Sequence, residues 1–398
     1  MLRTMAEAAV AGRARPPFWR NIRVLRALGQ ALFVLAIVYV FREMFLNLQF
    51  GLDRQGQTLS FDFLQQRAGF SIKEGISYSP NQSFVRALQV GLVNTLRVAV
   101  FGIILASILG LVMGVARLST NWLVRKIAQV YVEAIRNTPL AIQLVFWFVA
   151  VILALPAIQG GLSLWGIAFL SNRGSAVPWF RANDSFGLWV VFLLVGVVAA
   201  FFVRRWRTGV NERTGEPARA FLWTIGVFLA VAAVGYVVAG SPLRIDVPKL
   251  LVRSYEGGAQ LSPEYTALLL GLVVYTGAFI AEIVRGSILA VSKGQKEAGE
   301  ALGLTPRQQL RFVVLPQALR VAIPPINSQY LNLTKNSSLG LLIGYPDIVS
   351  VGRTIANQAG GATQVLLIWM ATFLTLSLTI SFFMNLLNRA VTRRGARI

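Results

Sequence analysis

The chain has 398 residues, of which 55% are hydrophobic and 14% charged, and its mean hydropathy is +0.62. Soluble globular proteins carry roughly 25% charged residues, so this composition favours a membrane protein, although the formal charge of +22 would also fit a nucleic-acid binder. The absence of Cys and His excludes disulfides, zinc ribbons, iron–sulfur clusters, thiol nucleophiles and a Ser-His-Asp triad.

Long apolar segments favour a membrane protein over a nucleic-acid binder. A membrane-spanning helix needs about 20 mostly apolar residues, and eight segments are predicted to be such helices: 27–49, 89–116, 129–155, 187–203, 220–239, 265–284, 321–345 and 365–388. The first follows an Arg-rich start, but Arg42-Glu43 interrupts its end and no small-residue cleavage pattern follows, so we interpret it as an uncleaved span. The predicted fold class is an all-α integral membrane protein.

The cations predict the orientation of these spans, because cytoplasmic loops are enriched in Lys and Arg. One side receives 24 of them, from 1–26, 117–126, 204–219, 285–320 and 389–398. The other side receives 10, from 50–88, 156–186, 240–264 and 336–364. Both termini are therefore predicted to be cytoplasmic, and Arg204-Arg205-Trp206-Arg207 is interpreted as a stop-transfer signal. This topology accounts for the charge without nucleic acid.

The same spans predict the division of the chain. Residues 1–26 form a cytoplasmic N-terminal segment, and 27–84 hold the first span with an external loop. Residues 85–390 form the main transmembrane domain, with an inserted two-helix segment at about 156–264. Residues 391–398 form a cytoplasmic tail.

The loop after the sixth span has a distinctive local pattern. Gly303 suits the left-handed position that ends a helix. Thr305 fits an N-cap, Pro306 the first helical position and Gln308 the third residue of a capping box. We expect a helical elbow whose second helix, about 306–314, ends before Pro316. Such an elbow fits a groove on a partner, and local physics allows an ordinary surface loop equally well.

This stretch resembles the EAA loop of ABC-transporter permease subunits. In that loop three residues separate Glu-Ala-Ala from a Gly, and nine residues separate this Gly from Ile-x-Leu-Pro. Here Glu297-Ala298-Gly299 precedes Gly303, and Val313-Val314-Leu315-Pro316 follows with the same spacing. Gly299 and Val313 depart from the pattern by small changes of volume.

Further segments resemble the polar-amino-acid branch of that family. They are Tyr131–Leu140 (YVEAIRNTPL), Ala281–Gly286 (AEIVRG), Gly294-Gln295 and Lys335–Leu339 (KNSSL). The resemblance covers about 85–155 and 265–390. The length and the inserted pair of spans are similar to the longer permease subunits of general L-amino-acid transporters of the Aap and Bzt type.

The resemblance implies a type I importer core, MetI-like, with a cytoplasmic coupling helix that docks on a separate ATPase. The implied coupling residues are Glu297, Ala298, Gly299, Gly303, Leu304, Leu315 and Pro316. The dipeptide Gly-Lys does not occur, so this chain has no P-loop for ATP phosphates. The chain is expected to hold no cofactor and no metal, and ATP and Mg²⁺ are expected on the partner ATPase.

Two charged pairs stand near the predicted cytoplasmic ends of spans. Glu133 and Arg136 are three residues apart, and so are Glu282 and Arg285. Such pairs are ordinarily interfacial ion pairs that fix helix register. The alternative is a gate whose partners exchange during transport.

The seventh span is the best candidate for a translocation path. Ser328, Asn332 and Lys335 or Asn336 recur at helical spacing, and a polar face is costly against lipid. Pro324-Pro325 is expected to break the helix, and broken helices flank many transporter sites. Asn332, Asn336, Ser337 and Ser338 are predicted to line the path, with Lys335 attracting a substrate carboxylate. Thr138 and Gln143 are weaker candidates. The alternative is hydrogen bonding between helices.

The predicted function is the permease subunit of an ATP-driven importer for L-amino acids in the bacterial inner membrane, without enzymatic activity of its own. The expected partners are a homologous permease in a heterodimer, an ABC ATPase dimer, a periplasmic or extracellular amino-acid-binding protein and the lipid bilayer, and no nucleic acid. The alternatives are an ATP-independent secondary transporter or channel and a membrane-embedded enzyme. The spacing of the EAA-like stretch favours the importer.

Overall fold

The computed structural model describes residues 19, 21–54, 56, 59–214, 220–252 and 254–395. Residues 1–18 of the predicted N-terminal segment and 396–398 of the predicted tail therefore lie outside the described residues. The chain divides into two compact units, Met1–Phe63 and Leu64–Ile398.

The described part of the first unit is dominated by one long helix, α2 (Ile22–Arg54). Its hydrophobic side chains are exposed along its length, and Val24–Gly51 is long and apolar enough to cross a membrane. The helix predicted at 27–49 is confirmed within these bounds. The short 3-10 helix η2 (Asp62–Gln65) follows it in the chain.

The second unit is mainly helical. Its helices are α3 (Phe84–Ala116), α4 (Trp122–Arg136), α5 (Leu140–Val145), η3 (Phe146–Ile152), η4 (Ile158–Gly160), α6 (Phe186–Thr214), α7 (Ala220–Val238), α8 (Pro263–Leu289), α9 (Lys293–Ala301), α10 (Pro306–Gln309), η5 (Leu310–Val314), α11 (Leu315–Asn336), η6 (Ser337–Ile343), α12 (Ile348–Ala359) and α13 (Ala362–Gly395).

Six helices in the described residues are long and apolar enough to span a membrane: α2, α3, α6, α7, α8 and α13. A bent pair made by α4 with α5 and η3 would raise the number to seven. The predicted third span is therefore not one straight helix, because the axis turns by 107° at the break before Pro139. The predicted seventh span falls on α11 and η6, which are not among the helices long and apolar enough to span a membrane. The predicted total of eight spans therefore stays a prediction.

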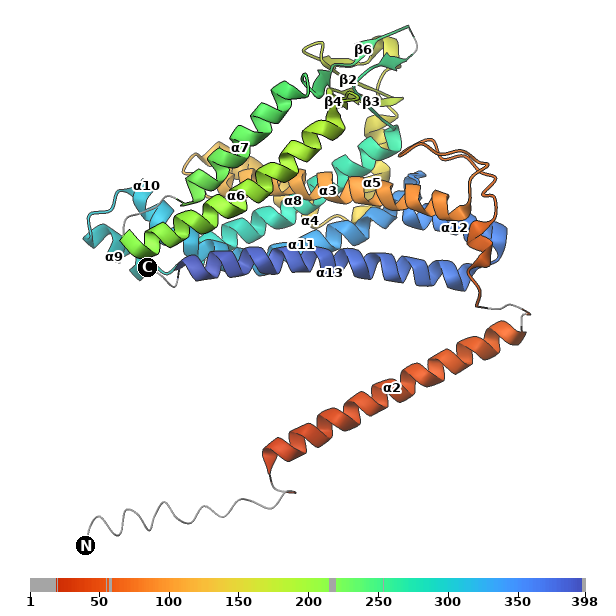
Figure 1. Ribbon diagram of the computed structural model, residues 1–398, viewed down its shortest axis with the longest axis horizontal. Coiled ribbons are helices and arrows are strands. Elements are labelled where there is room, and N and C mark those ends of the chain that lie inside the picture. Colours follow the sequence, from red (N-terminus) through yellow and green to blue (C-terminus); the bar gives the residue numbers. More distant parts are fainter. Residues whose placement is uncertain are drawn as a thin grey trace. The chain divides into compact units, whose positions relative to one another are not determined.

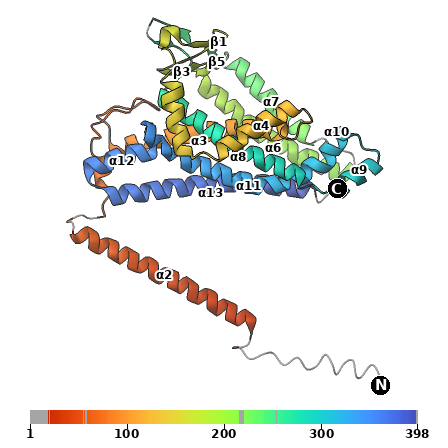
Figure 2. The ribbon, with the colours of Figure 1, turned by 180° about the vertical axis from the view of Figure 1, so that it is seen from behind.

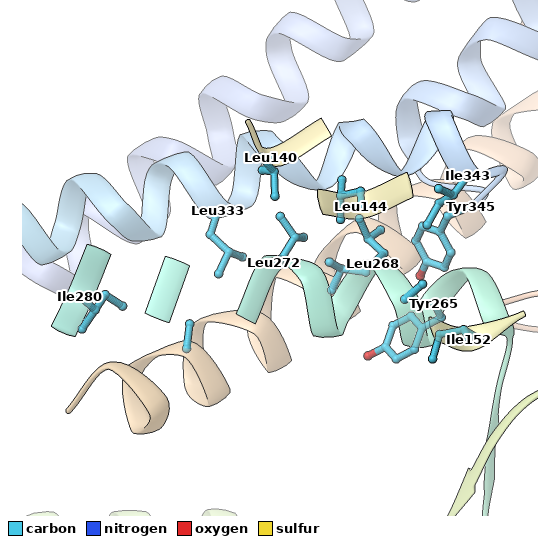
Figure 3. Close-up of a cluster of buried hydrophobic side chains, with 13 residues drawn as sticks. Leu140, Leu144, Ile152, Tyr265, Leu268, Leu272, Ile280, Leu333, Ile343 and Tyr345 are labelled. Atoms are coloured by element: carbon cyan, nitrogen blue, oxygen red, sulfur yellow. The ribbon is translucent and has the colours of Figure 1, made fainter. Parts of the chain in front are cut away.

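Close packing of α3 on α8 forms the centre of the second unit. A Cβ at Gly110 would lie 2.5 Å from the Ile280 Cβ, and one at Gly114 would lie 2.7 Å from the Ala281 carbonyl oxygen. Only glycine allows the two helices to approach this closely. The adjoining hydrophobic cluster joins α5, α8 and α11 through Leu144, Leu268, Leu272 and Leu333 (Figure 3).

The segment between η3 and α8 contains eight short strands that the sequence analysis did not predict. They are β1 (Leu162–Leu164), β2 (Ala168–Ser171), β3 (Gly174–Val177), β4 (Trp179–Ala182), β5 (Leu243–Asp246), β6 (Lys249–Leu250), β7 (Tyr255–Glu256) and β8 (Ala259–Leu261). One antiparallel sheet has the order β1-β2-β3-β8, with Ala176 opposite Gln260, and β4–β5 and β6–β7 form two-stranded sheets. The long helices α6 and α7 lie between β4 and β5 in the chain, as the predicted two-helix insert requires.

The two ends of the second unit contain different helices and strands. Figures 1 and 2 both show α9, α10, the end of α13 and the adjoining ends of α6 and α7 at one end, while the strands and α12 lie toward the other. Within this unit, the segments predicted to be cytoplasmic that form α9, α10 and the adjoining ends of α6, α7 and α13 thus lie at one end. The helix α6 continues past the predicted limit at 203 to Thr214, so the basic residues from Arg204 to Arg207 lie on a helix.

Candidate functional site

The elbow between α9 and α10 has the predicted local geometry. Gly303 has φ of +71°, in the left-handed region. The Thr305 hydroxyl accepts a hydrogen bond from the Gln308 amide at 3.4 Å, and the Gln308 side chain accepts one from the Thr305 amide at 2.9 Å. This reciprocal capping box confirms the start of the second helix at Pro306.

Contacts across the elbow hold its two helices together. The Gln309 side chain donates a hydrogen bond to the Lys296 carbonyl at 2.5 Å, and the Leu304 amide donates to the Gly299 carbonyl at 3.0 Å. Gly299 is buried, and a Cβ there would lie 3.1 Å from the Gln309 Nε2. Glycine at position 299 therefore leaves room for the Gln309 side chain to form its hydrogen bond with the Lys296 carbonyl.

The outer surface of the elbow is exposed. Glu297 and Ala298 point away from the fold, and Leu302 is 80% exposed, which is unusual for a large apolar side chain on a structured turn. The elbow thus presents an exposed apolar side chain and an exposed carboxylate. Leu304, beside Gly303, is half-buried.

We expected the second helix of the elbow to end before Pro316, but the helical backbone continues past this residue. A π-helical turn, η5, continues directly into α11, whose first turn contains Leu315 and Pro316. Pro316 therefore costs a backbone hydrogen bond inside this helical path, at the junction where the π-helical turn passes into the α-helix. The elbow and α11 therefore form one continuous helical path.

The expectation that Pro324-Pro325 breaks the helix is also wrong. Both prolines lie inside α11, which runs to Asn336. The regular helix ends where η6 begins at Ser337, and Gly344, with φ of +81°, ends η6. The polar residues of the predicted path therefore lie on the last turns of α11 and the start of η6.

One of the two predicted ion pairs forms. The Glu282 carboxylate accepts hydrogen bonds from Arg285 at 2.5 and 3.2 Å, and it also pairs with Arg117 at the end of α3. We call Arg117, Glu282 and Arg285 the ion triad. Arg117 is 165 residues from Glu282 in the sequence, so helical spacing could not identify it.

The expected Glu133–Arg136 pair does not form. The Glu133 carboxylate accepts a hydrogen bond from the Gln129 side chain at 2.8 Å. The Arg136 guanidinium carbon lies 5.2 Å from the centroid of the Phe279 ring. A cation–π contact with α8 thus replaces the expected pair, because the ring lies within reach of the long Arg side chain.

One face of α11 is polar and exposed. Ser328, Asn332 and Lys335 are exposed at spacings of four and three residues, whereas Leu333 and Thr334 on the opposite face are buried against the core. We call these three exposed residues the α11 polar stripe. In the described part of the chain Lys335 has no acidic partner.

The other predicted path residues have mixed surroundings. Asn336 and Ser338 are half-buried, and the Ser338 hydroxyl donates to the Lys335 carbonyl at 2.7 Å. Ser337 is fully buried and donates to the Thr334 carbonyl at 2.7 Å, so its side chain stabilises the end of α11.

The side chains of Thr138 and Gln143 form hydrogen bonds with backbone carbonyls at the break between α4 and α5. Thr138 is exposed and donates to the Ala134 carbonyl at 2.9 Å. Gln143 is buried, and its amide donates to the carbonyls of Ile135 and Thr138 at 2.8 and 2.9 Å. These bonds replace backbone bonds lost at Pro139. A role for either residue in the path stays a prediction.

The sequence analysis missed a buried polar cluster at the end of the unit opposite the elbow. Asp347 is the N-cap of α12, and its carboxylate accepts a hydrogen bond from the Ser350 amide at 2.8 Å. Asn94 of α3 donates to the Pro346 carbonyl at 2.9 Å, and Thr95 accepts from the Ile348 amide at 3.0 Å. Burial raises the pKa of Asp347 to about 7, against the opposing effect of its backbone hydrogen bonds.

A cavity of about 430 Å³ lies near this cluster and away from the elbow. Arg97, Phe101, Trp179 and Tyr265 are among its lining residues, so it joins α3, α8 and the strands. Arg97 pairs with Glu74 at 3.0 Å and lies 5.1 Å from the centroid of the Tyr265 ring. Its charge is therefore already compensated within the fold.

Comparisons with known proteins identify what the chain is similar to. Residues 102–395 match the model of the family described as "Binding-protein-dependent transport system inner membrane component". The chain is 43% identical to the general L-amino acid transport system permease protein AapQ of Rhizobium johnstonii, over 86% of each chain. It is 41% identical to the putative amino-acid ABC transporter permease protein YhdX of Escherichia coli, over 93% of this chain and 95% of that one. It is 37% identical to the glutamate/glutamine/aspartate/asparagine permease BztB of Rhodobacter capsulatus, over 90% and 91%.

Proposed function

Because the chain belongs to the family of inner membrane components of binding-protein-dependent transport systems, we propose that it forms part of the translocation path of an ATP-driven importer for L-amino acids. The relatives named above, similar over most of their length, support this substrate class. The chain itself is a transport subunit and not an enzyme.

The elbow carries the proposal. Its exposed Leu302 and Glu297 are suited to a groove on a separate ATPase, and its internal hydrogen bonds keep it rigid. A rigid elbow that continues into α11 without a break transmits displacement along the helix axis. Glu297, Ala298, Leu302 and Gly303 form the exposed part of the proposed ATPase contact, and the buried Gly299 and half-buried Leu304 support it from within. Leu315 and Pro316 begin the helix that it moves.

The partners follow from this role. A homologous permease faces the α11 polar stripe across the path in a heterodimer, an ATPase dimer binds ATP and Mg²⁺ beneath the elbows, and a binding protein delivers the amino acid from the opposite side. The termini face the cytoplasm. ATP-driven closure of the ATPases brings two elbows together, and hydrolysis resets them.

The α11 polar stripe is the proposed path surface of this subunit. Exposed Ser328, Asn332 and Lys335, on a segment that the sequence predicts to lie in the membrane, require water or protein against them rather than lipid. Lys335 offers an uncompensated ammonium to a substrate carboxylate, and the half-buried Asn336 and Ser338 adjoin it. Ser337 supports this surface from behind.

The ion triad connects the proposed moving parts. Glu282 and Arg285 lie on α8 just before α9, and Arg117 ends α3. The triad therefore fixes α8 against α3 at the level of the elbow. Exchange of its partners between two states is the proposed gate.

The decisive experiment measures the chain co-expressed with its ATPase, partner permease and binding protein in proteoliposomes. Wild type is expected to show ATP hydrolysis stimulated by binding protein with an L-amino acid, together with uptake. Gly303→Val forces a β-branched residue to a φ of +71°, which distorts the turn. Uptake per ATP should fall at least tenfold.

Gly286→Val is the matched control, because a Cβ at Gly286 meets no atom within 4 Å and its backbone is helical. Full coupling in Gly303→Val, or uptake that needs no ATP, would refute the proposed role. Failure with every L-amino acid tested would reject the substrate class only.

A further inference from the structure

A basic cluster stands near the end of α6. It consists of Arg204, Arg205 and Arg207, and the first two side chains are exposed. No acidic side chain in the described residues pairs with any of the three. Three cations within four helical positions repel one another, so this surface favours an anion beside it.

Two tryptophans accompany the basic cluster. Trp206 is 64% exposed and Trp223, on α7, is 50% exposed. The Arg207 guanidinium carbon lies 4.7 Å from the centroid of the Trp223 ring, and the Arg207 Nε is buried without a hydrogen-bond partner. Exposed tryptophans beside arginines are typical of the level where lipid headgroups meet hydrocarbon.

A groove of about 420 Å³ continues from Trp223 along α7. Its described lining residues are all apolar or glycine: Leu222, Trp223, Gly226, Val227 and Ala230. A Cβ at Gly226 would meet no atom within 4 Å, so the groove is open at that point. Trp223 thus borders both the groove and the cation of Arg207.

The hairpin of α6 and α7 leaves these surfaces facing outward because its own helices are packed on each other. A Cβ at Gly235 would lie 2.3 Å from the Phe192 Cβ, and the Trp189 indole donates to the Ala232 carbonyl at 3.0 Å. The opposite faces carry exposed Val, Leu and Phe side chains. These faces suit hydrocarbon.

We propose that this surface binds one anionic phospholipid. Its phosphate lies between Arg204 and Arg205, its glycerol region lies over Arg207 and Trp223, and one acyl chain follows the groove past Gly226. One amphiphilic molecule thereby satisfies the unpaired cations and the open apolar groove together. Basic pockets beside transmembrane helices select anionic headgroups on this basis.

The test titrates the full-length chain in mild detergent with phosphatidylglycerol and, separately, phosphatidylcholine, and counts bound lipids by native mass spectrometry. Wild type should bind one phosphatidylglycerol at least tenfold more tightly than phosphatidylcholine. Each cation near an anionic headgroup contributes roughly fivefold, so the double variant Arg204→Gln/Arg205→Gln should lose roughly 25-fold. Gly226→Leu should weaken both lipids, because it fills the groove.

The control removes two cations elsewhere. Arg244→Gln/Lys249→Gln makes the same change in net charge at exposed positions on β5 and β6, at the other end of the α6–α7 hairpin, and should leave the affinity unchanged. Glycerophosphoglycerol, the headgroup without acyl chains, should not displace the lipid at equal concentration. Equal affinities for the two lipids, equal losses in both double variants, or displacement by the free headgroup would each overturn the proposal.

Discussion

Asp347 gives the sharpest quantitative prediction. Its carboxylate is fully buried, one oxygen accepts the Ser350 amide and the other has no hydrogen-bond partner. An unpaired buried charge is costly, which is why the pKa of Asp347 is raised to about 7 from its ordinary value near 3.8. The substitution Asp347→Asn keeps the shape and the N-cap oxygen while removing the charge.

The direction in which stability changes with pH follows from proton binding. Because its folded-state pKa is raised, the folded protein holds this proton more tightly than the unfolded chain does, so its stability falls as the pH rises from about 4 through 7. A difference of roughly three pKa units at 1.36 kcal/mol each amounts to about 4 kcal/mol over the full range. Between pH 5 and pH 8 the loss is about 2.5 kcal/mol, or roughly 5 °C in the unfolding midpoint.

The assay compares unfolding midpoints of wild type and Asp347→Asn in the same detergent at pH 5, 6, 7 and 8. The two should nearly coincide at pH 5, and the variant should become progressively more stable as the pH rises. The control Asp184→Asn changes an exposed carboxylate and should follow wild type. Parallel curves for wild type and Asp347→Asn would refute the assignment of the pH dependence to this buried group.

Three further predictions concern other residues. Lys335→Ala should raise the KM for uptake roughly tenfold or more, because a hydrogen bond to a charged group contributes about 1.5–3 kcal/mol, while the unfolding midpoint stays constant; an unchanged KM would exclude carboxylate binding. Glu282→Gln leaves two guanidinium groups facing each other and should lower the stability by about 1–3 kcal/mol, measured by thermal unfolding; an unaltered midpoint would show that the ion triad contributes nothing. Gly110→Ala should destabilise by about 1–3 kcal/mol through its clash with Ile280, whereas Gly286→Ala in open space should not, and equal midpoints would contradict close packing.

Much of the helical layout follows from the sequence because long apolar runs and local caps leave strong signals. The capping box of Thr305 and Gln308, the left-handed Gly303 and the first helix are all local features, and local patterns predict them. The break after α4 differs from the prediction of one span at 129–155: Pro139 lies in this break, and the angle of 107° depends on packing.

Other features depend on residues far apart in the chain. Arg117 meets Glu282 only because α3 packs on α8. Asp347 is buried where Asn94 and Thr95 of α3 bond its neighbours Pro346 and Ile348. The strands between 162 and 261 are two to four residues long, too short for a recognisable alternation. Pro324-Pro325 misled the prediction because tertiary packing keeps α11 helical through both.

The pairing of β3 with β8 has a consequence for how this chain could be shortened. Val177 lies opposite Ala259, so the chain leaves this sheet and returns to it at adjacent positions after about eighty residues. Everything between them, the α6–α7 hairpin included, could be replaced by a short connecting turn at the cost of a few contacts, such as that of Trp179 with Phe101 and that of Tyr255 with Phe169. A chain with Val177 joined to Ala259 by such a turn should still fold its α3–α8 centre, and it would reveal what the added module contributes to the transporter.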